Sequence, residues 1–201
     1  MGLKSTSDTK VNFEDLYTMD DPLANPPFRG TMEIGEGEDF ELLYGTLRPK
    51  KPIVVKWFMG GAPKDVIWTG HAVPVIVSDR FIEILRREKF TGWSTYPVKV
   101  YGKDCKEIPG YHGLAITGRA GPIDESKSEI VVRDPIAPGG RPLIRRKGLY
   151  FDPTTWDGSD LFLCGKWGGI FIRGNVKRTL ERAKVRNVSY AVTTEVEQPA
   201  D

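Results

Sequence analysis

The side chains best suited to covalent or metal chemistry in this chain are two cysteines and two histidines. They are Cys105, Cys164, His71 and His112. Cys105 and His112 together offer a thiolate nucleophile and a base, the pairing that activates cysteine in nucleophilic enzymes. They lie in a turn-rich stretch, and no sequence typical of an oxyanion-binding loop accompanies them. A small enzyme with an unrecognised site near Cys105 and His112 therefore remains one alternative.

Metal and phosphate binding have less support. The four cysteine and histidine side chains are scattered, and the spacing Cys105-x6-His112 matches no usual arrangement of zinc ligands. The stretch GSDLFLCGKWGG contains Gly-Lys, but Trp167 stands where a P-loop has its magnesium-binding hydroxyl. The paired acids Asp157 and Asp160, in WDGSD, are most simply turn formers. We expect no catalytic residue, no metal site and no cofactor.

Charge is unevenly spread along the chain. Residues 1–45 hold ten acidic and three basic side chains, which leaves a net charge of +9 for the remainder of a chain whose total is +2. The densest acidic stretch is EIGEGEDFE, which contains Glu33, Glu36, Glu38, Asp39 and Glu41. Gly35 and Gly37 suggest a flexible projecting turn able to enter a basic cleft of a partner, because complementary charge speeds association. A solvated loop is the alternative interpretation.

A basic helix offers a rival binding surface through Arg178 and Arg182. Together with the Arg-Arg-Lys run at 145–147, it also raises the alternative of a nucleic-acid-binding module. Glu181 and Glu195 dilute the positive charge, so nucleic acid is the less favoured partner.

Two segments with a similar spacing of apolar residues predict the main helices. VSDRFIEILRR and IRGNVKRTLER both place apolar residues on one helical face, and each is flanked by short β-favouring runs. We expect residues 75–98 and 170–193 to form two strand–helix–strand units with a common core and a shared sheet. Leu85 and Leu180 should both be buried, and Asn175 should cap the second helix. The expected class is α+β, strand-rich.

Composition indicates the following boundaries. Residues 1–30 end in DDPLANPPFRG, whose prolines predict an extended N-terminal arm. Residues 31–196 are expected to form a single domain, and residues 197–201 a disordered tail. No apolar run is long enough to span a membrane, and the two distant cysteines indicate reduced cytoplasmic thiols. The start MGLKST fits a myristoylation pattern, which also occurs by chance.

Four stretches in order resemble the Imm11 family of predicted immunity proteins, which are encoded beside polymorphic toxin genes. They are PVIVSDRFIEILRREKFTGWSTYPVKVY, IPGYHGLAITGRAGPID, WDGSDLF and IFIRGNVKRTLERAKVRNVSY, and the resemblance covers roughly residues 40–196. The first helix keeps the family's Val-Ser-x-Arg start at Val77, Ser78 and Arg80. The second has Ile-Arg-Gly-Asn at 172–175, which puts any binding role of that start in doubt.

The resemblance implies a cytoplasmic inhibitor that occupies a cognate toxin protein and protects the producing cell. Such a protein needs a shaped, charged surface and no reactive centre. It would also have no membrane partner. The resemblance identifies neither the toxin nor the surface that binds it.

Overall fold

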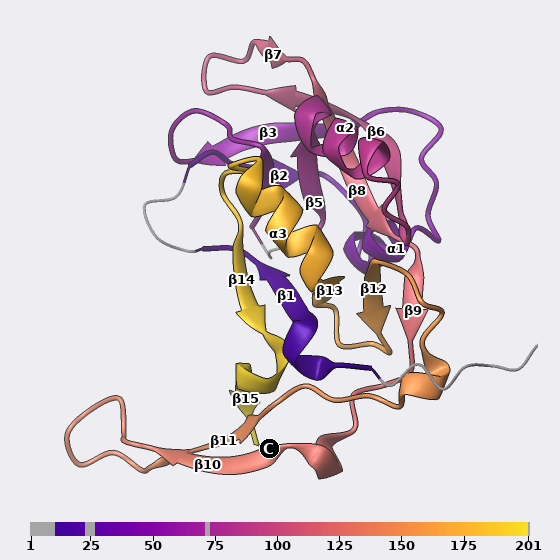
Figure 1. The fold of residues 1–201 in the computed structure, drawn as a ribbon. Helices are drawn as coiled ribbons and strands as arrows, with labels where there is room; N and C mark the ends of the chain where they lie inside the picture. The colour runs from indigo at the N-terminus through magenta and orange to yellow at the C-terminus, as the bar shows by residue number, and fades with distance from the viewer. Residues whose placement is uncertain (1–10, 23–26, 71–72, 201) are drawn as a thin grey trace, which may run out of the picture.

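The computed structural model describes residues 11–22, 27–70 and 73–200, which form three β-sheets and three α-helices (Figure 1). The helices are α1 (Glu38–Tyr44), α2 (Asp79–Arg87) and α3 (Gly174–Arg182). Fifteen strands accompany them in the described ranges, so the strand-rich α+β class expected from the sequence is confirmed at that level. His71 and the MGLKST start lie outside the described residues.

Six strands of the largest sheet close into a barrel. In spatial order the sheet contains β3 (Ile53–Met59), β2 (Arg29–Met32), β4 (Val66–Thr69), β5 (Val75–Ser78), β8 (Tyr111–Ile116), β6 (Trp93–Tyr101) and β7 (Glu107–Ile108). β3 also pairs in parallel with β6, with Ile53 opposite Val98, and this pairing joins the two ends of the six-strand series. Closure leaves these six strands without free edges, and β7 pairs with β6 outside the ring. Nothing in the sequence pattern indicated this closure.

The N-terminal segment corrects one expectation. A five-stranded sheet has the order β14 (Ser189–Val192), β1 (Leu16–Asp20), β13 (Ile170–Arg173), β12 (Leu161–Cys164), β9 (Gly118–Ala120). β1 is antiparallel to both neighbours, and its side chains Leu16 and Met19 are buried. Part of the expected arm at residues 1–30 is therefore an interior strand. The prolines that suggested an arm follow this strand and separate it from β2.

The C-terminal segment corrects the expectation of a disordered tail at residues 197–201. A three-stranded sheet contains β10 (Glu129–Arg133), β11 (Leu143–Lys147) and β15 (Glu197–Pro199), in that order. β15 lies within the expected disordered tail and pairs with β11 through the register Lys147 opposite Glu197. Figure 1 shows the β10–β11 hairpin projecting from the rest of the molecule, with β10 outermost.

The two predicted helices lie on different sheets. We expected a shared sheet, but β5 and β6 belong to the barrel, whereas β13 and β14 belong to the five-stranded sheet. In both segments a third strand separates the pair, because β8 lies between β5 and β6 and β1 lies between β13 and β14. Leu85 and Leu180 are fully buried, as predicted, and belong to one apolar cluster with side chains of both sheets.

The ends of α2 and α3 have matching geometry. Lys89 and Lys184, each just beyond the helix, have φ values of 58° and 53°. Their starts differ: Ser78 caps α2 by accepting a hydrogen bond from the Phe81 amide at 3.3 Å. α3 begins one residue before Asn175, which is therefore not its N-cap. Treating the two segments as copies of one unit stays a prediction.

Candidate functional site

The structure does not bring Cys105 and His112 together. His112 lies on β8 opposite Pro97 of β6, and its Nε2 is 2.6 Å from an Asp79 carboxylate oxygen. Cys105 lies beyond Tyr101, in the turn between β6 and β7. The strand from Pro97 to Tyr101 alone spans roughly 13 Å, so a direct thiol–imidazole contact is excluded in this conformation.

The cysteines differ in their surroundings. Cys105 is exposed and lines an open hollow of about 510 Å³ together with Trp57, Tyr101, Lys56 and Lys103. Cys164 is buried, and burial raises the pKa of its thiol well above the ordinary value, which disfavours the nucleophilic thiolate. Among the described residues, no group of three or more histidine, cysteine or acidic side chains is placed to hold a metal ion.

The paired acids of WDGSD hold loops in place. Asp157 accepts hydrogen bonds from the amides of Arg119 and Ser159, at 2.8 and 2.9 Å. Asp160 accepts from both the amide and the hydroxyl of Thr91, at 2.9 and 3.0 Å. These contacts fasten the loop before β12 to β9 and to the segment after α2, in keeping with the turn role expected from the sequence.

The Ser-x-Arg start of α2 also connects elements of the fold. Arg80 pairs with Asp65 at 3.0 Å and donates a hydrogen bond to the Ala183 carbonyl at the end of α3. Asp65 also accepts from the Arg186 amide at 2.9 Å, and its side chain is only 10% exposed. Sequence reasoning missed Asp65, since nothing near position 65 marks a carboxylate that joins two distant helices.

The acidic stretch is more ordered than the flexible turn we expected. Gly37 adopts a left-handed φ of 81° directly before α1, which therefore begins inside the stretch. Glu38 accepts a hydrogen bond from the Gly35 amide at 2.7 Å, and Glu33 pairs with Lys56 at 2.7 Å. The pairing with Lys56 lowers the pKa of Glu33. Asp39 accepts from the Phe40 amide at 2.9 Å, so three of the five acids have partners at fixed positions.

Two of the acids lie beside a hollow. Glu36 and Asp39 line a depression of about 340 Å³, whose other walls come from β2, the end of β4 and the segment at Val73 and Pro74. Thr69 lines the same depression and is 4% exposed, and its buried hydroxyl oxygen has no hydrogen-bond partner among the described residues. Glu41 is exposed farther along α1. The two carboxylates make this depression suited to a hydrogen-bond donor that carries positive charge.

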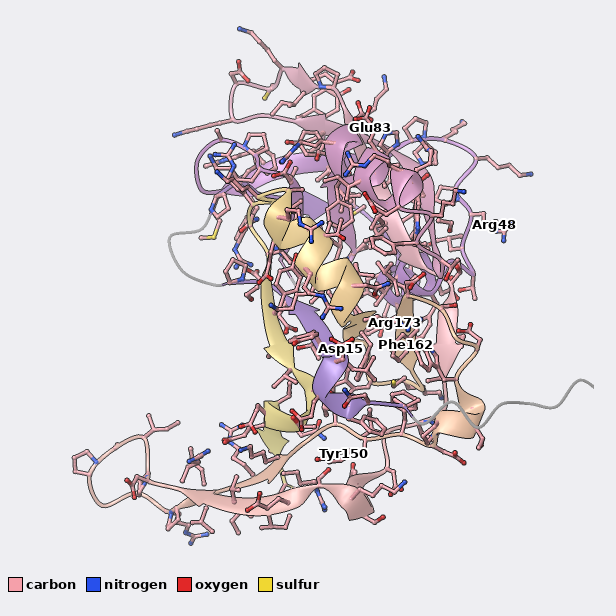
Figure 2. All side chains as sticks on the ribbon, in the orientation of Figure 1. Asp15, Arg48, Glu83, Tyr150, Phe162 and Arg173 are labelled. Atoms are coloured by element: carbon pink, nitrogen blue, oxygen red, sulfur yellow. The ribbon has the colours of Figure 1, made fainter. Side chains whose placement is uncertain are left out.

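The rival basic surface is partly neutralised within the chain. Arg178 pairs with Asp15 at 2.7 Å, and this contact raises its pKa. Figure 2 labels Asp15, which lies beside α3. Arg182 is exposed on the same helix. Lys177 bonds Glu181 at 2.8 Å, so two cations of α3 already have acidic partners.

Comparison with known proteins places these features in a family context. A family model described as "Immunity protein family (Imm11)" matches residues 4–195 of the 201. No curated protein matches the chain. In the described part of the chain, no helix has the length and apolar character needed to cross a membrane.

Proposed function

Because the chain belongs to the Imm11 family of immunity proteins, we propose that it binds a cognate toxin and neutralises it. The observation that carries this proposal is the family match, which extends over nearly the whole chain. Blocking a toxin requires a complementary surface and no turnover, and the separation of Cys105 from His112 is in keeping with that requirement. We further propose that the protein acts in the cytoplasm of the producing cell, within a polymorphic toxin system.

We propose that the acidic stretch is the toxin-binding surface. Support comes from the hollow beside Glu36 and Asp39, which places two carboxylates at one depression. A lysine or arginine side chain of the toxin would pair with both. The basic surface at Arg178 and Arg182 is the less favoured candidate, because Arg178 is already paired with Asp15.

The function is tested by co-expression. The toxin encoded beside this gene is expressed in a sensitive host, with and without this chain, and growth and co-purification are scored. We expect rescue of growth and a stable complex. A folded chain that neither rescues growth nor binds the toxin would overturn the proposed function.

The surface is tested by charge reversal. Glu36→Lys should slow association with the toxin roughly tenfold at low salt, and the difference should shrink as salt screens the charges. Glu83→Lys is the matched control, because Glu83 is an exposed acid on α2 (Figure 2). If the two variants associate at the same rate and with the same salt dependence, the assignment of toxin binding to the acidic stretch is wrong. Arg182→Glu then tests the basic surface at Arg178 and Arg182.

A further inference from the structure

The β10–β11 hairpin exposes apolar side chains that the rest of the chain leaves uncovered. Ile130, Val132 and Ile144 are 52%, 66% and 55% exposed, and Ile136 near the hairpin tip is 88% exposed. Val132 lies opposite Ile144, and Ile130 belongs to the same face because residues two apart on a strand point the same way. An apolar face on a projecting hairpin is typical of a surface that meets a partner.

β10 is also an edge strand. The sheet order β10-β11-β15 leaves one side of β10 without a neighbouring strand in the described chain, and the strand spans five residues, Glu-Ile-Val-Val-Arg. Backbone groups along such an edge are a template for pairing with another strand. The hairpin therefore presents both an apolar face and an open edge.

We infer that this edge pairs with β10 of a second copy of the chain, antiparallel and centred on Val131. In that register Glu129 lies opposite Arg133 of the second copy, and Ile130 lies opposite its Val132. The two-fold symmetry repeats both pairs, so every position of the strand meets a complementary one. Shifting the register by two residues in either direction loses both charge pairs and shortens the overlap.

The charges on the strand also have neighbours within the chain. Glu129 makes no salt bridge among the described residues, although its charge acts on Lys147, its neighbour across the sheet, and on Arg133. Arg133 bonds Glu197 of β15 through Nε and Nη2, so a carboxylate of the second copy would have to bind Nη1 or replace Glu197. The Arg133 side chain is 54% exposed. The self-complementary charges are the reason to assign the edge to a second copy over an unrelated strand.

Pairing also brings apolar side chains together. Directly opposed residues of an antiparallel pair have Cβ atoms about 4.5–5.5 Å apart. Ile130 and Val132 of each copy would therefore flank one another on the face that Ile144 shares. A five-residue edge falls short of the roughly 800 Å² per partner of a stable interface, so we expect a weak, concentration-dependent dimer. This inference does not depend on toxin binding.

Cysteine cross-linking tests the register. In a Cys105→Ser background, Val131→Cys should form a disulfide-linked dimer under mild oxidation, because the two Val131 positions oppose each other. Val132→Cys is the matched control, since its two copies would be offset by two residues and lie roughly 8 Å apart, beyond disulfide reach. A mixture of Ile130→Cys and Val132→Cys chains should cross-link. Equal cross-linking of the Val131 and Val132 variants, or none in any combination, would overturn the register.

Charge exchange tests the partner. Sedimentation at increasing concentration should show the wild type dimerising, whereas Glu129→Arg and Arg133→Glu each remain monomeric when alone. Mixing the two variants should restore the dimer, since each arginine then faces a glutamate. Glu129→Arg breaks no salt bridge among the described residues, but it places an arginine opposite Lys147, so thermal melting must show that both variants remain folded. A wild type that stays monomeric up to 1 mM would overturn the inference, and loss of toxin binding in Ile130→Asp would then assign the face to the toxin.

Discussion

Asp65 should be among the most sensitive polar positions in the protein. Its carboxylate accepts from the Arg80 guanidinium, from the Arg186 amide and more distantly from Ser78, at 3.0, 2.9 and 3.4 Å. Asp65→Asn keeps the shape of the side chain but removes the charge and turns one acceptor into a donor. That donor must face either Arg80 or the Arg186 amide, both of which are donors themselves.

The expected loss can be worked out from these contacts. A hydrogen bond to a charged group contributes about 1.5–3 kcal/mol, and Asp65 makes two good ones. The Arg80 side chain is half-exposed, and water screens its share of the interaction. We therefore expect Asp65→Asn to lower the free energy of unfolding by about 2–4 kcal/mol. For a chain of this size that corresponds to a fall in Tm of roughly 4–16 °C.

Urea unfolding followed by tryptophan fluorescence measures the effect. Asp104→Asn is the control, because Asp104 pairs with Lys106 on an exposed turn and should leave the unfolding midpoint unchanged. A double-mutant cycle with Arg80→Met separates the contribution of the guanidinium from that of the Arg186 amide. If Asp65→Asn unfolds at the wild-type midpoint, Asp65 does not join the ends of α2 and α3 in the way described.

Three other outcomes are expected. Leu85→Ala and Leu180→Ala should each cost about 2–5 kcal/mol in urea unfolding, because both side chains are fully buried, and a near-neutral result for either would contradict that burial. Burial raises the pKa of Asp20, so ionising this group disfavours the folded state as pH rises above the ordinary value of 3.8. Asp20→Asn should therefore raise the urea midpoint at pH 7, with the gain vanishing well below pH 3.8. Finally, Cys105→Ser and His112→Ala should retain protection against the toxin in the growth assay, and loss of protection by a folded His112 variant would favour an enzyme.

Local pattern was sufficient for α2 and α3 but not for α1 or for the sheets. The apolar face of α2, with Phe81 and Leu85, follows the helical period closely, and both side chains are fully buried. The barrel depends on the pairing of Ile53 with Val98, two residues far apart in the chain, and no local signal specifies that contact. The prolines that follow β1 led us to predict an extended arm over the whole of residues 1–30. A proline restricts only its own backbone and that of the residue before it, so a strand can form upstream of it.

The sequence revealed the acidic composition of the candidate surface but not its backbone structure. The acidic residues are obvious in the sequence, yet the glycines between them do not make a flexible turn, because Gly37 supplies the left-handed conformation that begins α1. Thr69 is one of many threonines in the sequence. Its place in the wall of the depression arises because β4 ends next to α1, which no local pattern indicates.

The position of β1 determines when a newly made chain can fold. This strand is made long before its neighbours β13 and β14, and Thr18 lies opposite Ala191, 173 positions later in the sequence. The five-stranded sheet must therefore wait until β14 has been made, and the apolar side chains of β1 lack these neighbours in the nascent chain until then. A product that stops before β13 would lack both neighbours of β1. The surfaces of the five-stranded sheet, and any partner binding that depends on them, therefore appear only after β14 has been made.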